Sequence, residues 1–214
     1  MPQTIVTVDG PGGTGKSTVS RRVAAEAGLP HLDTGAFYRA ATLAVIEAGV
    51  DPSDGEAVNT VVSRARMSQD DGRMFLDGRD VSAEIRTDMV TSAVSAVSAD
   101  PGVRETLVEL QRRWVSEHGG GVVEGRDIGS VVFPDATLKV FLDASPEVRA
   151  RRRALETGEP FDEVLADLNR RDRLDSSRAA SPLRIPEEAI VVDTSDLSLE
   201  DVVERLVGLI TAKS

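Results

Sequence analysis

Residues 4–17 read TIVTVDGPGGTGKS, and this stretch decides the fold. The β-branched residues Thr4 to Val8 predict a short buried strand, and Asp9-Gly10 predicts a tight turn directly after it. The segment Ser17 to Ala27 is typical of a helix, which we expect to end at Gly28. A strand, a glycine-rich loop and a helix therefore follow one another without interruption.

The loop matches the pattern G-x-x-x-x-G-K-[ST], whose glycines let backbone N–H groups turn inward around a phosphate chain. The N-terminus of the following helix adds free donors and a positive dipole. In this pattern Lys16 reaches the β- and γ-phosphates, and the Ser17 hydroxyl can bind Mg²⁺. An ordinary glycine-rich turn is the alternative, but the position between a strand and a helix favours phosphate binding. The expected ATP-binding residues are Gly10, Pro11, Gly12, Gly13, Thr14, Gly15, Lys16, Ser17 and Thr18.

The rest of the chain alternates between strand and helix patterns. Apolar runs at 121–124 and 138–142 suit central parallel strands, and shorter strand signals occur at 31–32 and 189–192. This alternation predicts an α/β fold of the P-loop type, with three layers (α/β/α) and a mostly parallel, five-stranded central sheet. The expected helices cover residues 35–48, 83–99, 101–117, 146–156, 161–175 and 199–211.

Residues 63–81 have a different character. The turn signals Asp70-Asp71-Gly72 and Asp77-Gly78 flank the short run Arg73 to Leu76. We therefore expect a small antiparallel meander inserted between helices.

Composition excludes several classes of protein. With 25 basic and 36 acidic residues, the net charge of −11 disfavours nucleic-acid polymers and anionic membranes as partners. The absence of cysteine excludes disulfides and thiol chemistry, and two histidines cannot build a His-rich metal site. The sequence has no secretory-signal pattern and no apolar run of membrane-spanning length, so we expect a cytoplasmic location.

The basic residues are almost all arginine. Only Lys16, Lys139 and Lys213 are lysines among the 25, which leaves 22 arginines. Codon bias combined with a solvated surface is one interpretation. Phosphate binding is the other, because the planar guanidinium is always charged and matches phosphate geometry.

The chain lacks the Asn-Lys-x-Asp string of regulatory GTPases and the Leu-Ser-Gly-Gly-Gln string of transporter ATPases. A small-molecule kinase is therefore the expected class, and it needs a second anionic site facing the γ-phosphate. Three clusters could supply that site: residues 33–39, residues 124–129 after an apolar run, and the Arg-rich segments 149–153 and 170–178. Each cluster also has an alternative without a binding role. Residues 33–39 could be an N-capped surface helix, residues 124–129 a salt-bridged turn, and the Arg-rich segments a solvated helix.

Six segments carry a family resemblance when they are taken in order: residues 8–18, 32–39, 81–86, 124–135, 139–144 and 171–179. In this order they closely resemble the bacterial cytidylate kinase (CMP kinase) family, nearly end to end. The resemblance implies a single P-loop kinase domain over 1–214. It also implies a nucleotide-monophosphate-binding region over about 35–100, with the small sheet near 63–81 inserted in it, and an Arg-rich helical lid over about 149–178.

The resemblance also implies the residues that bind CMP. In the family, arginines hold the phosphate, polar side chains read the base, and further residues contact the ribose. An Asp that accepts from the exocyclic amino group of cytosine agrees with this assignment. The matching residues are Arg39, Arg126 and Arg178 for the phosphate, Ser95, Arg104 and Asp127 for the cytosine, Arg171 and Asp175 for the ribose, and Thr34 and Tyr38 along the same pocket.

The implied reaction transfers a phosphoryl group from ATP to CMP or dCMP with Mg²⁺ and without a covalent intermediate. The expected catalytic residues are Lys16, Arg126, Arg152 and Arg178, and the expected state is a monomer. Another acceptor, such as UMP, AMP or a small metabolite, is an alternative. An ATP-dependent switch protein without acceptor chemistry is a second one.

Two departures from the family pattern are present. Asp33-Thr34-Gly35 replaces the usual Asp-Ser-Gly and keeps the hydroxyl. The loop ends in Gly-Lys-Ser-Thr, where many nucleoside monophosphate kinases have Gly-Lys-Gly-Thr. This ending leaves both Ser17 and Thr18 as candidate Mg²⁺ ligands, of which Ser17 is preferred less firmly than in the usual pattern.

Overall fold

The computed structural model describes residues 3–177 and 183–213. Its contacts divide the chain into two compact units. The first comprises Met1–His31 and Val115–Ser214, and the second comprises Leu32–Trp114.

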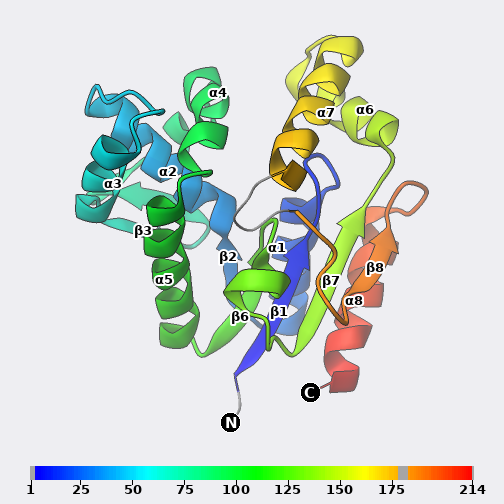
Figure 1. The fold of residues 1–214 in the computed structure, drawn as a ribbon. Helices are drawn as coiled ribbons and strands as arrows, with labels where there is room; N and C mark the ends of the chain where they lie inside the picture. The colour runs from blue at the N-terminus through cyan, green and yellow to red at the C-terminus, as the bar shows by residue number, and fades with distance from the viewer. Residues whose placement is uncertain (1–2, 178–182, 214) are drawn as a thin grey trace. The chain divides into compact units, whose positions relative to one another are not determined.

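The central sheet has five strands in the order β2-β6-β1-β7-β8 (Figure 1). Strands β6, β1, β7 and β8 belong to the first unit, and the boundary between the units falls within β2. Strand β1 (Thr4–Asp9) lies in the middle and pairs in parallel with β6 (Gly120–Glu124) and β7 (Leu138–Asp143). Strand β8 (Ile190–Asp193) pairs in parallel with β7, and β2 (His31–Asp33) lies beside β6. The loop after β1 therefore leaves the middle of the sheet at its carboxyl edge.

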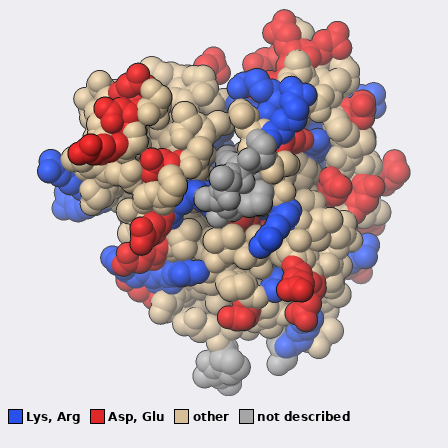
Figure 2. Space-filling model, viewed as in Figure 1, with Lys and Arg blue, Asp and Glu red and all other residues tan. Residues whose placement is uncertain are grey.

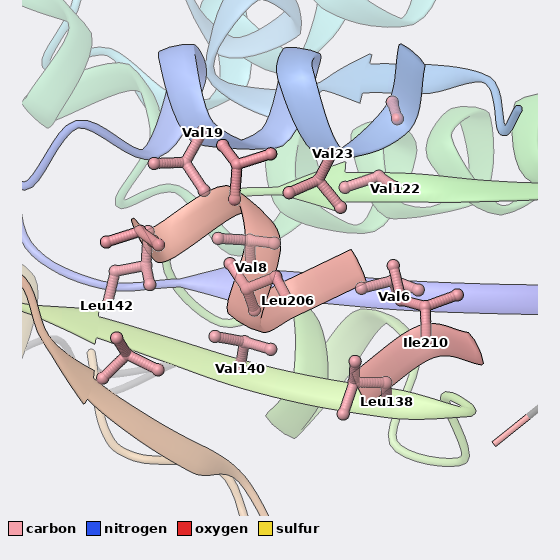
Figure 3. Packing of buried hydrophobic residues seen from close by; sticks show 14 residues of the cluster. Val6, Val8, Val19, Val23, Val122, Leu138, Val140, Leu142, Leu206 and Ile210 are labelled. Atoms are coloured by element: carbon pink, nitrogen blue, oxygen red, sulfur yellow. The ribbon is translucent and has the colours of Figure 1, made fainter. Parts of the chain in front are cut away.

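Helices α1 (Lys16–Ala27) and α8 (Leu199–Lys213) pack on one face of this sheet (Figure 3). Alternate residues of β1 point toward them, because side chains along a strand alternate between its two faces. The buried cluster takes residues from both helices and from four strands, and each is almost inaccessible to water. Its labelled members in Figure 3 are Val6, Val8, Val19, Val23, Val122, Leu138, Val140, Leu142, Leu206 and Ile210.

The other side chains of β1, Thr7 and Asp9, face a single turn of π-helix at Ile128–Val132. The approach is close: a Cβ added to Gly129 would lie 2.7 Å from Thr7 Oγ1 and 3.3 Å from Asp9 Oδ2. Glycine at position 129 therefore lets this turn pack closely against the side chains of Thr7 and Asp9 on the central strand.

Helices α6 (Pro146–Thr157) and α7 (Phe161–Ser177) follow β7 and pack on each other around Ala150, Val164 and Leu168. The Ser145 hydroxyl accepts a hydrogen bond from Val148 N at 3.3 Å, which caps the start of α6.

The second unit holds α2 (Thr34–Glu47), α3 (Gly55–Arg64), a small antiparallel sheet, α4 (Asp88–Val97) and most of α5 (Pro101–Glu117). The sheet has the order β3-β4-β5 and confirms the meander predicted within residues 63–81. Asp71 and Asp77 have positive φ in its two turns, as their turn signals indicated. Its strands are Met67–Asp70, Arg73–Leu76 and Arg79–Asp80.

The continuous helix predicted over residues 83–99 is wrong. A 3₁₀ turn at Glu84–Arg86 comes first, Thr87 is extended with ψ 158°, and α4 begins only at Asp88. The break changes which residues face inward: Val90 and Val97 are buried, whereas Met89, expected on the apolar face, is 59% exposed.

The fold class is confirmed as α/β with a mostly parallel central sheet of five strands and a separate small antiparallel sheet. Helix α3 was not predicted from the sequence. Within residues 3–177 and 183–213, no helix is both long enough and apolar enough to cross a membrane.

Candidate active site

The loop between β1 and α1 has the backbone that the glycines predicted. Gly13 and Gly15 have φ of 79° and 86°, values that residues other than glycine rarely adopt. Gly10 allows a close approach, because a Cβ there would lie 2.1 Å from the carbonyl oxygen of Leu142 on β7. The loop is therefore fixed against the sheet at its first residue.

Lys16 begins α1, and its side chain is only 7% exposed. Its Nζ donates a hydrogen bond of 2.6 Å to the carbonyl of Pro11, and Thr14 Oγ1 donates to the same oxygen at 3.1 Å. The ammonium therefore lies inside the curl of the loop, beside the positive end of the helix dipole. This concentration of positive charge suits a phosphate chain.

Ser17 meets a buried carboxylate at the end of β6. Its hydroxyl donates to Glu124 Oε2 at 2.8 Å, and Glu124 Oε1 lies 3.1 Å from His31 Nε2. Burial alone would raise the pKa of Glu124, but hydrogen bonds from His31 and Ser17, together with the charge of Lys16, hold that pKa below its ordinary value. Glu124 is therefore an anion beside the Ser17 hydroxyl.

The pair formed by Ser17 and Glu124 has the donor chemistry that Mg²⁺ prefers, since both offer hard oxygen atoms. Thr18 is exposed on the next position of α1. No group of three or more His, Cys, Asp or Glu side chains able to hold a metal occurs in the described part of the chain.

Asp9, the last residue of β1, is fully buried. Its carboxylate accepts hydrogen bonds from the backbone N–H groups of Ile128 at 2.7 Å and Gly129 at 2.8 Å. Burial raises the pKa of Asp9 to about 6, with a further contribution from the negative charge of Asp127, although the two backbone donors and Lys16 oppose the rise. Asp9 thus fixes the turn that follows Arg126 and Asp127.

Arg126 and Asp127 lie between β6 and this turn. The Nη2 atom of Arg126 is 3.6 Å from where a Cβ on Gly12 would lie, so this guanidinium is beside the loop. Asp127 is buried, and its carbonyl accepts from Val131 N at 2.9 Å. Both predicted site residues are therefore close to the end of the central strand.

Several arginines of α6 and α7 bind other groups of the protein. Arg152 donates to the side chain and carbonyl of Thr194 at 3.1 and 2.6 Å, and Arg171 pairs with Asp167 at 2.8 Å. Figure 2 shows basic side chains gathered over α7 on the visible face. Asp175 belongs to α7, and Arg178 lies outside the described residues.

The remaining predicted residues belong to the second unit. Thr34 begins α2, whose first turn is capped by Asp33 accepting from Ala36 N at 3.1 Å. In the same unit the Arg104 guanidinium lies 5.5 Å from the centre of the Tyr38 ring, a cation–π distance. The structure therefore brings these two predicted residues together.

Arg39 and Ser95 lie on α2 and α4 of that unit. Arg39 Nη1 donates to the carbonyl of Ile85 at 3.0 Å and to Thr91 Oγ1 at 2.9 Å, and Ser95 is half-buried. The 3₁₀ turn and the start of α4 thus orient the Arg39 side chain.

Sequence reasoning missed three members of this site. The sequence predicts only a turn at Asp9, places Glu124 in a motif without a specific role, and indicates no role for His31. Their only signal was position, since each stands at an end of a predicted strand. The pairing of β1 with β6, which sets Val8 opposite Glu124, is not readable from a single sequence.

Residues 6–212 match the family model for cytidylate kinase. The chain belongs to the cytidylate kinase family. Its relatives include the cytidylate kinase of Mycobacterium leprae, 52% identical over 219 residues, with 100% of this chain and 98% of that protein covered. The cytidylate kinase of Caldanaerobacter subterraneus is 48% identical, with 94% of this chain and 92% of that protein covered.

Solved structures of lower identity share the fold of this cytidylate kinase family member. A gluconokinase from Sinorhizobium meliloti superposes with a TM-score of 0.52 at 16% identity, covering 99% of this chain and 93% of that one. The protein TT1252 from Thermus thermophilus gives 0.53 at 22% identity, covering 100% and 98%. At these identities the likeness concerns the fold alone.

Proposed function

We propose that this chain transfers the γ-phosphoryl group of ATP to CMP or dCMP, giving ADP and CDP or dCDP. Membership in the cytidylate kinase family supports this reaction. The observation that carries the proposal is the strand, loop and helix arrangement in which Lys16 is buried inside the loop and Ser17 meets Glu124. This arrangement supplies the phosphate cradle that such a transfer needs.

Phosphoryl transfer depends on in-line positioning and charge neutralisation, so no covalent intermediate is required. Lys16 and Arg126 would neutralise charge on the transferred group, and Arg152 and Arg178 are the further arginines that we assign to it. One well-placed arginine contributes about 10³ to 10⁵ in rate in related reactions.

Mg²⁺ is part of the proposal. Ser17 would hold the ion, with Glu124 beside it and Thr18 as the alternative hydroxyl. When bound, the ion would supply positive charge that offsets the negative charge of the phosphates. The lowered pKa of Glu124 supports this role, because the carboxylate remains ionised.

The acceptor site is assigned on the family resemblance. Stacking of Arg104 on Tyr38 supports a pocket for a flat base in the second unit. Regions 35–100 and 149–178 are proposed as the acceptor-binding region and the lid, whose closure would exclude water from the transferred group. The assigned residues are Thr34, Tyr38, Arg39, Ser95, Arg104, Arg126, Asp127, Arg171, Asp175 and Arg178.

A monomer in the cytoplasm, acting on small nucleotides, completes the proposal. A steady-state panel of CMP, dCMP, UMP and AMP with ATP tests it, with ADP release and the phosphorylated product measured together. We expect CMP and dCMP to be turned over fastest. Faster turnover of UMP or AMP would overturn the base assignment, and ADP release without product would indicate a switch protein.

A matched pair of lysine variants belongs to the same experiment. Lys16→Ala should lower kcat by about 10³-fold, since it removes the charge inside the loop. Lys213→Ala removes an exposed lysine at the end of α8, whose Nζ donates to the Thr137 carbonyl at 3.3 Å. This control should keep full activity.

A further inference from the structure

Arg149, on α6 of the first unit, uses three of its guanidinium nitrogens in contacts with the protein. Its Nε donates to the carbonyl of Ala144 at 3.0 Å, and its Nη1 donates to the carbonyl of Gly12 at 2.9 Å. Its Nη2 pairs with Asp172 Oδ2 at 2.7 Å, and the side chain is 4% exposed. One guanidinium therefore connects the start of α6, the phosphate loop and α7.

The loop also packs directly on these two helices. A Cβ on Gly13 would lie 3.0 Å from the Cβ and 3.1 Å from the carbonyl oxygen of Arg149. A Cβ on Gly12 would lie 3.3 Å from Leu168 Cδ2 of α7. Residues 12 and 13 therefore rest on α6 and α7 with no room for a side chain at position 13.

The bond from Arg149 to Gly12 determines the direction of a loop N–H group. A trans peptide is planar, so its C=O and N–H point in opposite directions. Because the Gly12 carbonyl is held by Arg149, the N–H of Gly13 in the same peptide points away from Arg149. N–H groups of such loops are the donors that bind phosphate.

Asp172 determines where Arg149 can lie. A buried guanidinium needs an anionic partner, since an uncompensated charge in the interior is costly. Asp172 Oδ2 provides that partner, while its buried Oδ1 has no hydrogen-bond partner among the described residues. A shift of α7 would therefore move Arg149, and with it the peptide between Gly12 and Gly13.

We propose that Arg149 is a positioning residue for ATP binding, which transmits the position of α7, through Asp172, to the Gly12–Gly13 peptide. The proposal rests on the proposed function only in requiring that the loop binds a nucleotide triphosphate. It assigns Arg149 to the loop backbone and not to a nucleotide.

The test is a double-mutant cycle read out by calorimetric binding of MgATP without acceptor. Arg149→Met should raise the Kd for MgATP about tenfold, and Asp172→Asn about threefold. Because Asp172 acts through Arg149, Asp172→Asn should have no further effect in the Arg149→Met background. In steady state, KM for ATP should rise while KM for CMP stays within about twofold.

Asp162→Asn is the control, because it makes the same chemical change in the first turn of α7 at an exposed position. It should leave the Kd for MgATP unchanged. Thermal unfolding reports whether each variant folds. If Arg149→Met does not fold, the Kd values of Asp172→Asn and Asp162→Asn for MgATP are compared instead, and only Asp172→Asn should show a raised Kd.

Multiplicative effects of the two substitutions on Kd would overturn the proposal. So would an Asp172→Asn protein with a lower Tm and an unchanged Kd, or an equal rise in KM for ATP and for CMP. MgATP binding with no turnover of CMP would refute the proposed function and leave this inference intact, since the calorimetric cycle contains no acceptor.

Discussion

The Ser17 hydroxyl donates a hydrogen bond of 2.8 Å to Glu124 Oε2. The two residues are far apart in the sequence, but β6 lies beside β1 with Glu124 opposite Val8, so the carboxylate meets the first turn of α1. His31 holds the second oxygen of the same carboxylate. Hydrogen bonds to Ser17 and His31 therefore hold both oxygens of the Glu124 carboxylate in place.

Glu124→Gln should raise the Mg²⁺ concentration that gives half-maximal activity by about tenfold, because it removes a negative charge beside the proposed ligand Ser17. Mn²⁺ binding to the enzyme–ADP complex, measured by electron paramagnetic resonance, should weaken in parallel. Glu26→Gln, on the exposed side of α1 where Glu26 pairs with Arg22, is the control. An unchanged Mg²⁺ requirement would remove Glu124 from the metal site.

Asp127→Asn should reduce the preference for cytosine. Replacing the carboxylate puts an amide N–H₂ where an acceptor for the amino group of cytosine is proposed, so the ratio of kcat/KM for CMP to that for UMP should fall by about tenfold or more. Asp135→Asn, at an exposed position after the turn, should leave the ratio unchanged. A constant ratio in the Asp127 variant would show that the base is read elsewhere.

The raised pKa of Asp9, about 6, predicts a pH dependence of stability. A carboxyl whose pKa is higher in the folded state stabilises the fold most when it is protonated, and this contribution is lost as pH rises from about 4 through about 6. When the pH is lowered from 7.5 to 5, the free energy of unfolding of the wild type should therefore rise by about 1 kcal/mol relative to that of Asp9→Asn. Urea unfolding of both proteins at the two pH values measures the difference. A difference that is the same at both pH values would contradict the assignment.

Gln111 on α5 is fully buried, and neither of its side-chain polar atoms has a hydrogen-bond partner among the described residues. Gln111→Met removes the unpaired amide at similar volume, so it should raise the free energy of unfolding by about 1 kcal/mol. The matched control is Gln69, also buried, whose Oε1 accepts from Asp33 N at 3.0 Å. Gln69→Met should destabilise, and the reverse order of the two melting temperatures would refute the argument.

The sequence predicted the central sheet and the phosphate loop because both have strong local signals. The β-branched run before the loop and the glycines within it need no knowledge of distant residues. Helix 83–99 was predicted as continuous from apolar spacing alone. Thr87 breaks it, since its hydroxyl donates to the Glu84 carbonyl at 2.9 Å and its backbone is extended. A side chain that competes with the helix in this way leaves no mark on the apolar pattern.

The site residues divide in the same way. The loop pattern predicts Lys16 and Ser17. In contrast, strand order and helix packing bring Asp9, Glu124 and Arg149 to the loop, and the sequence does not show these contacts. Arg149 was counted among the lid arginines because α6 is rich in that residue, and only tertiary contacts show its hydrogen bond to Gly12. Charge pattern alone does not separate an arginine that binds the backbone from one that faces solvent.

The position of β1 in the sheet has a consequence for synthesis of the chain on the ribosome. Both neighbours of β1, residues 120–124 and 138–143, are translated more than a hundred residues after it, and the α6 and α7 contacts to Gly12 and Gly13 come later still. A nascent chain therefore carries its glycine-rich segment unpaired through most of translation, and contacts of such sequence separation form late. We therefore expect the loop to reach its folded conformation only after residues 120–177 have been synthesised.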